Sequence, residues 1–144
     1  MGASNAVLAG SFTLAYWCVL VAALLPYVCA SLAKSGGVGK SRRDGGFDNH
    51  DPRAWLAQQT SWHARANAAQ ANSFEGLPFF IGAVVIAHQL GAAQMWVDTL
   101  AVVYVLSRMA FIFCYVRDMP TARSAVWTVG LLANIGILLV GWRW

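Results

Sequence analysis

Charged side chains are scarce in this chain. Only 11% of its 144 residues are Asp, Glu, Lys or Arg, and 58% are hydrophobic, whereas average soluble domains carry about 25% charged residues. So little charge does not cover a surface that faces water. The composition therefore excludes an ordinary soluble domain and predicts an integral membrane protein that is surrounded by lipids.

Motifs for metal, redox and nucleic-acid chemistry are also missing. The cysteines lie in apolar segments without CxxC or Cys/His spacing, and the histidines fit no metal site. We interpret the thiols as buried and structural. The net charge of +4 comes from basic residues in loops beside apolar spans, where such residues meet lipid head groups, so we expect no nucleic-acid partner. The residues concerned are Cys18, Cys29, Cys114, His50, His63 and His88.

A signal-peptide pattern is absent as well. Residues 1–10 contain no Lys or Arg, whereas a secretory signal peptide opens with a basic region. We therefore expect the first apolar segment to be retained as a membrane span.

The sequence contains four apolar segments of membrane-spanning length, for which about 20 residues suffice. We expect an all-α, four-helix membrane bundle in a single domain, 1–144, with a polar loop at 34–51 and spans at about 11–32, 52–90, 94–116 and 120–142. Asp51 followed by Pro52 predicts the start of the second helix. Pro78 predicts a kink in it, and Gly91 predicts its end.

Basic residues are distributed unequally between the two sides of the predicted bundle. The loops after the first and third spans hold most of them, and the opposite side holds only Arg143. The positive-inside rule therefore predicts cytoplasmic loops and both termini on the other side. The basic loop residues are Lys34, Lys40, Arg42, Arg43, Arg53, Arg117 and Arg123.

Arg65, Asn72 and Glu75 are polar residues within the second predicted span. At about 100° per residue, Asn72 lies within roughly 20° of Arg65 and Glu75 within about 80°, so all three share a face. An ionisable group at membrane depth costs several kcal/mol unless it has a partner or a water-filled cavity. The pattern indicates a polar pocket between helices, and a purely structural ion pair remains the alternative.

The third and fourth spans carry similar residues. Arg108 lies mid-span with Tyr115 within about 20° of the same face, and we expect Arg108 to pair with Glu75. Arg123 and Ser124 follow Pro120 in the first turn of the fourth helix, near Arg117. A helix N-terminus favours anions, so this turn predicts a thiolate or carboxylate site. A lipid-facing arginine with a capping serine is the alternative.

Taken in order, these residues resemble the MAPEG family, the membrane-associated proteins in eicosanoid and glutathione metabolism. The second span reads R-A-N-A-A-Q-A-N-S-F-E-G-L-P-F-F from Arg65 to Phe80, similar to the family's Arg…Asn-x-x-Glu…Pro signature. Arg108 with Tyr115, and the pair Arg123-Ser124, continue the resemblance, which covers nearly the whole chain. The loop sequence F-D-N-H-D-P-R-A-W-L-A resembles the bacterial branch, which implies a bacterial inner membrane.

The resemblance implies a homotrimer with a glutathione site between subunits, near the cytoplasmic face. By position, Arg65, Asn72 and Glu75 would bind glutathione, as a co-substrate. Tyr115 would contact the tripeptide. Arg123 would stabilise the thiolate, with Ser124 as a second donor. Arg108 would support the site from below, and Arg117 would be a further cation. Eukaryotic catalytic members have a second arginine one turn before the asparagine, and this chain has Ala68 there, which removes an anion contact.

Three functions are compatible with these features. The first is a membrane transferase or peroxidase that uses glutathione on lipophilic small molecules. The second is a non-catalytic scaffold or lipid-binding protein with the same fold. The third is a small-solute transporter that uses the Arg65 and Glu75 face as a pathway, although no inverted repeat is visible.

Overall fold

The computed structural model describes residues 12–142 of the chain, and every regular element in that range is helical. Four of the helices are long and apolar enough to cross a membrane, which confirms the predicted class of an all-α membrane protein. The elements are α1 (Leu14–Lys34), η1 (Ser35–Gly37), η2 (Arg42–Asp44), α2 (Pro52–Ala57), α3 (Ser61–Gln89), α4 (Gln94–Val116) and α5 (Pro120–Val140).

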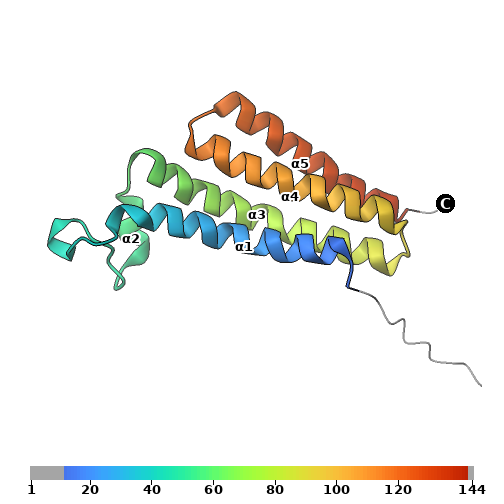
Figure 1. Cartoon of the computed structure of the whole chain (residues 1–144), viewed down its shortest axis with the longest axis horizontal. Coiled ribbons are helices and arrows are strands. Elements are labelled where there is room, and N and C mark those ends of the chain that lie inside the picture. Colours follow the sequence, from blue (N-terminus) through green and yellow to red (C-terminus); the bar gives the residue numbers. More distant parts are fainter. Residues whose placement is uncertain (1–11, 143–144) are drawn as a thin grey trace, which may run out of the picture.

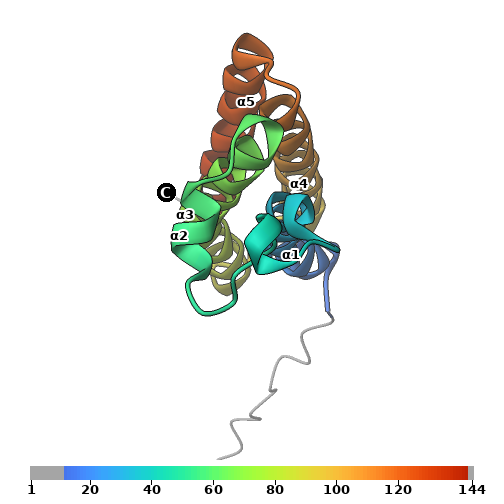
Figure 2. The ribbon, with the colours of Figure 1, turned by 90° about the vertical axis from the view of Figure 1, so that its left-hand side faces the viewer.

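The four long helices lie side by side in one elongated bundle (Figure 1). Helix α4 packs mainly on α5, and α1 packs mainly on α3, while α3 and α4 also contact each other. Viewed from the end, α1 and α5 lie at opposite corners of the bundle (Figure 2). The loop after α1, the short α2 and the α4–α5 turn gather at one end, which we call the loop end.

Small residues let the helices approach one another closely. The core contains many alanines, and Gly130 of α5 lies against Ser107 of α4, where an added Cβ would come within 2.5 Å of the hydroxyl oxygen. Small residues play this role in membrane bundles because lipid and core are equally apolar, and close packing then stabilises the helix contacts. The buried alanines are Ala15, Ala22, Ala33, Ala66, Ala69, Ala83, Ala87, Ala101 and Ala133.

The first turn of α1 is held by a side chain from another helix. Asp98 of α4 accepts a hydrogen bond from the backbone N–H of Ala15 at 2.8 Å, and it also accepts one from Gln94. Its carboxylate thereby satisfies an unpaired donor at the N-terminus of α1, where negative charge is favourable.

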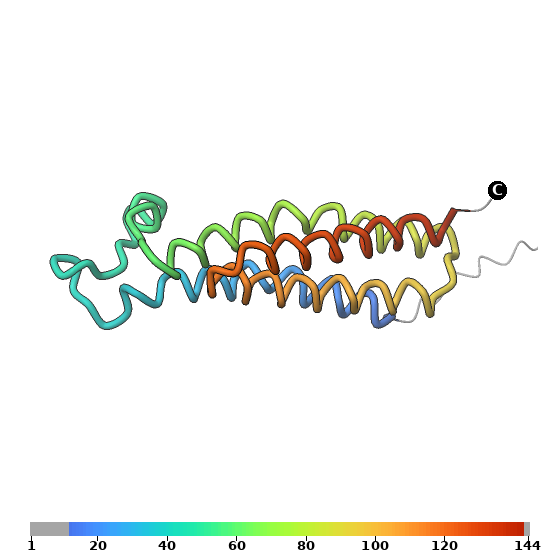
Figure 3. The backbone as a smooth tube through the Cα atoms, turned by 90° about the horizontal axis from the view of Figure 1, so that it is seen from above, coloured from blue at the N-terminus to red at the C-terminus, as the bar shows by residue number. Residues whose placement is uncertain are grey.

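The second predicted helix, 52–90, is two helices in the structure. Helix α2 ends at Ala57 and α3 begins at Ser61, whose φ is 58°. The Gln59 side chain donates to the Trp55 carbonyl at 3.1 Å, which is the acceptor that a continuing helix would offer to the Gln59 backbone N–H. The bond occupies a carbonyl in the last turn of α2, where the intrahelical donors run out. As a result, α2 turns away from the axis of α3 (Figure 3).

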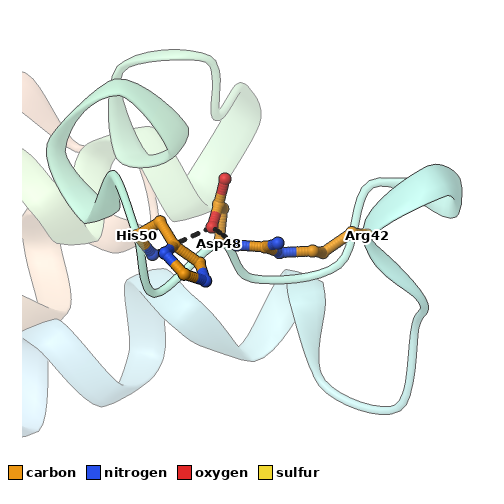
Figure 4. Close-up of polar contacts among 3 residues, drawn as sticks. All are labelled: Arg42, Asp48 and His50. Atoms are coloured by element: carbon orange, nitrogen blue, oxygen red, sulfur yellow. Dashed lines mark hydrogen bonds and ion pairs between the residues drawn. The ribbon is translucent and has the colours of Figure 1, made fainter.

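The loop after α1 folds around Trp55. The indole N–H donates to the Gly45 carbonyl, and the ring packs edge-on against Phe47. Farther out, Asp48 accepts hydrogen bonds from the Arg42 guanidinium and from the His50 backbone N–H (Figure 4). These bonds lower the pKa of Asp48, and the bond from the His50 N–H has the larger effect, followed by the bond from Arg42. Although it is rich in glycine, this loop has its own set of contacts.

Candidate functional site

A groove runs between α3, α4 and α5 from the loop end toward the middle of the bundle. It consists of two adjoining hollows that share Asn72 and Trp127, and we call it the polar groove. Its length along α5, from Arg123 to Asn134, is about 16 Å at 1.5 Å per residue. The outer hollow is lined by Asn72, Phe111, Tyr115, Arg123, Ser124, Trp127 and Thr128. The inner hollow is lined by Asn72, Glu75, Gly76, Phe79, Tyr104, Arg108, Trp127, Gly130, Leu131 and Asn134.

Arg108 is buried at the wall of the groove, with 5% of its surface exposed. Its guanidinium donates to the Asn72 side-chain oxygen at 2.9 Å and to the Ser73 hydroxyl at 3.4 Å. The ion pair that we expected between Arg108 and Glu75 is not formed, so that prediction is wrong. Asn72 lies between the two charges, since it accepts from Arg108 and donates to Glu75 at 3.4 Å.

Glu75 is exposed on the surface of the single subunit. In the part of the chain that the structure describes, no Lys, Arg or His lies within ion-pair distance of its carboxylate. A carboxylate on a membrane-spanning helix needs a partner or a water-filled cavity. Glu75 therefore marks the inner hollow as a place where a cation, a ligand or a second subunit is needed.

Arg123 lies at the outer end of the groove, in the first turn of α5 as predicted. Its guanidinium stacks over the Tyr115 ring at 4.3 Å, which is within cation–π range. No carboxylate between residues 12 and 142 forms an ion pair with it. The Ser124 hydroxyl donates to the Pro120 carbonyl at 3.1 Å, so its proton is already used within its own helix.

Arg65 lies apart from this groove, although the sequence placed it on the same face as Asn72 and Glu75. Its Nε donates to the Val116 carbonyl at 3.1 Å, and its guanidinium lies 3.8 Å from the Asp118 carboxylate. The long side chain is drawn to the end of α4, where the carbonyls are unpaired. Arg65 lines a separate hollow with Arg117 and Trp62.

Two residues of the groove, Trp127 and Asn134, were not predicted from the sequence. Trp127 follows Arg123 by one turn of α5 and lines both hollows. Asn134 also lines the inner hollow, and only 3% of its surface is exposed. A polar residue in the apolar run L-L-A-N-I-G-I-L-L-V is itself a signal of function or packing inside a membrane.

The remaining reactive side chains do not form a second centre. The three cysteines are free and buried, as expected. Among the described residues, no group of three or more His, Cys, Asp or Glu could hold a metal ion.

The fold and the groove together define an integral membrane protein with four spanning helices and a cation-lined groove within the apolar bundle. Compared with models of known protein families, the chain matches the MAPEG family over residues 14–142. The chain therefore belongs to the MAPEG family, whose members use glutathione. Searches of curated proteins and of solved structures gave no match.

Proposed function

We propose that this protein is a membrane-bound, glutathione-dependent transferase or peroxidase that acts on lipophilic electrophiles. The observation that carries the proposal is the pair of guanidinium groups in the polar groove. Arg108 and Arg123 both line it, and neither has a carboxylate partner among residues 12–142. Cations left without anions in an apolar surrounding favour an anionic ligand.

The charges of the groove complement those of glutathione, which has carboxylates, an ammonium group, amides and a thiol. Arg108 and Arg123 suit the carboxylates or the thiolate, and the unpaired Glu75 suits the ammonium group. Asn72 has an amide for hydrogen bonding to the peptide. Ala68 offers no cation, but the guanidinium of Arg108 already lies beside Asn72.

The proposed chemistry needs a thiolate, because the thiolate rather than the thiol is the nucleophile. The Arg123 guanidinium stabilises the negative sulfur, and Tyr115 orients the guanidinium by stacking under it. The sulfur attacks an electrophilic carbon, a C–S bond forms, and the leaving group departs with the bonding electrons. The protein contributes positioning and charge stabilisation.

We also propose a homotrimer as the working unit. Glu75 is exposed on one subunit in a span that would otherwise contact lipid, and a neighbouring subunit would cover it and form the missing wall of the groove. Arg65 and Arg117 line a separate hollow, so in this assembly they would reach the ligand only from the side of the neighbouring subunit. Native mass spectrometry of the detergent-solubilised protein measures the subunit number, and a monomer would contradict this assembly.

The loop end is the basic end of the bundle, and we propose that it faces the cytoplasm of a bacterial inner membrane. Val38 is 76% exposed in this loop, so Val38→Cys provides a reporter for a membrane-impermeant thiol reagent. Labelling only after the cells are permeabilised supports this orientation, and labelling of intact spheroplasts contradicts it.

Conjugation of glutathione to a chromogenic aryl halide tests the activity. We expect turnover by the wild type and a loss of about 100-fold in kcat for Arg123→Ala, on the scale seen when one stabilising donor is removed. Arg43→Ala is the matched control, because Arg43 is an exposed loop arginine at the same end. Equal rates for wild type and Arg123→Ala would remove Arg123 from the mechanism. The absence of turnover and of glutathione binding would favour a non-catalytic scaffold or lipid-binding protein.

A further inference from the structure

The hollow that Arg65 lines, separate from the polar groove, lies between the beginning of α3 and the end of α4. Its lining consists of Trp62, Arg65, Val116 and Arg117. Val116 is the last residue of α4, whose 23 residues extend about 34 Å at 1.5 Å per residue. The hydrocarbon core of a bilayer is about 30 Å thick. When α4 spans this core, the hollow therefore lies at the level of the lipid head groups.

The two arginines of this hollow have donors to spare. The Arg65 Nε donates to the Val116 carbonyl at 3.1 Å, but its Nη1 lies 3.8 Å from the Asp118 carboxylate, which is too long for a hydrogen bond. The exposed Arg117 side chain forms no hydrogen bond or ion pair with residues 12–142. Because a guanidinium has five N–H donors, the hollow offers several of them to an acceptor from outside the subunit.

The charges of the hollow match those of a phosphodiester. Arg65 and Arg117 are both positive, and Asp118 beside Arg65 is negative, so one positive charge is left without a partner. A phosphodiester has one negative charge and two free oxygens, which arginine binds in bidentate geometry. Basic hollows between spanning helices bind anionic head groups, and Trp62 is of the residue type that is enriched at this level of the membrane.

We propose that this hollow is a binding site for the phosphate of an anionic phospholipid, such as phosphatidylglycerol. Arg65 and Arg117 donate to the phosphate oxygens, and the indole of Trp62 lies beside the head group. A zwitterionic lipid binds more weakly, because its cationic group meets the same two guanidinium groups. This inference does not rest on the proposed function, since the hollow is separate from the polar groove and its ligand is not glutathione.

The test measures lipid binding to the detergent-solubilised full-length protein by native mass spectrometry, with phosphatidylglycerol and phosphatidylcholine of identical acyl chains. We expect phosphatidylglycerol to bind the wild type about tenfold more tightly, which corresponds to one charge-assisted hydrogen bond. Arg117→Gln should remove most of this preference. Arg43→Gln is the matched control, because Arg43 is an exposed arginine in the loop at the same end, and it should keep the preference.

Asp118→Asn tests the site in the opposite direction. It removes the carboxylate that competes with the phosphate for Arg65, so it should tighten the binding of phosphatidylglycerol. Asn tolerates the φ of 59° at this position as Asp does, so the turn is kept. Weaker binding in Arg117→Gln together with tighter binding in Asp118→Asn is a result that misfolding does not produce.

Four results would overturn the lipid site. The first two are equal affinity of both lipids for the wild type and an equal loss in Arg117→Gln and Arg43→Gln. The third is unchanged or weaker binding in Asp118→Asn. The fourth is displacement of the lipid by millimolar inorganic phosphate or glutathione, which would assign the hollow to a soluble anion. Because the assay measures no turnover, a failure of the proposed enzyme activity leaves the result readable.

Discussion

Arg108 of α4 donates to the Asn72 side chain of α3 over 2.9 Å, so one amide connects the buried guanidinium with the exposed carboxylate of Glu75. This relay brings the polar residues of two helices together at the wall of the groove. It also leaves the charge of Arg108 without a direct anion among residues 12–142. The groove is therefore held together by neutral partners, while its charges remain available to a ligand.

Removing the Asn72 amide should lower the stability of the protein, because the buried charge of Arg108 loses its shortest hydrogen bond. Asn72→Leu leaves Arg108 with the longer Ser73 contact at 3.4 Å, so we expect a loss of about 1–3 kcal/mol of stability, measured by thermal unfolding in detergent. Asn67→Leu is the matched control, since Asn67 is a half-buried asparagine of the same helix that makes no polar contact within residues 12–142. Equal melting temperatures for the two variants would contradict the role of Asn72.

The close approach of α4 and α5 depends on Gly130, which has no side chain. In Gly130→Ala the new Cβ would lie 2.5 Å from the Ser107 oxygen, and such overpacking costs about 1–3 kcal/mol. Gly82→Ala is the control, because a Cβ at Gly82 meets nothing within 4 Å, and it should be neutral or stabilise the helix by about 0.5–1 kcal/mol. Adding Ser107→Ala to Gly130→Ala should restore part of the loss. Equal melting temperatures for the two glycine variants would refute this packing account.

The start of α1 should depend on Asp98. In Asp98→Ala the Ala15 N–H loses its charged acceptor, and hydrogen bonds to charged groups contribute about 1.5–3 kcal/mol. We expect faster hydrogen exchange in the first turn of α1, measured by mass spectrometry. Thr99→Ala, whose exposed side chain bonds only within α4, should leave that exchange unchanged. Slow exchange in both variants would show that other contacts hold the turn.

The loop after α1 should loosen in acid. Its Asp48 has a pKa below the ordinary value, because the ionised carboxylate accepts from the His50 N–H and from Arg42. The contribution of Asp48 is therefore complete above the unfolded pKa of about 3.9 and is lost as the pH falls through the lower folded pKa. Limited proteolysis by an acid-active protease across this range measures the opening. Asp48→Asn should be cut readily already above the unfolded pKa, at the upper end of this range. A cleavage rate of the wild type that does not change with pH would argue against this role.

Much of the fold could be predicted from the sequence because bilayer length and hydropathy leave few choices. Gly91 illustrates this, since it follows the end of α3 with a φ of 62°, where glycine is favoured. The break between α2 and α3 could not be predicted, because no Pro or Gly marks it. At the break the indole of Trp55 donates to the loop carbonyl of Gly45, and its own carbonyl accepts from the Gln59 side chain.

Helical angle alone was a weaker guide to the groove. It placed Arg65, Asn72 and Glu75 on one face of the helix, but it could not foresee that the Arg65 side chain reaches the Val116 carbonyl instead. A long, flexible side chain follows the nearest unpaired acceptor rather than the direction of its Cβ. The predicted direct pair of Glu75 and Arg108 does not form for a related reason, since Asn72 is close enough to bond with both.

Isothermal titration of glutathione into the purified protein tests the central claim, that the polar groove is a glutathione site, most directly. The account predicts saturable binding heat for the wild type. The affinity for glutathione should fall by at least about tenfold in Arg123→Ala and in Glu75→Gln, since each removes a charge complementary to the tripeptide. It also predicts unchanged binding in Arg43→Ala. Absence of heat up to millimolar glutathione, or equal affinity in all four proteins, would contradict it.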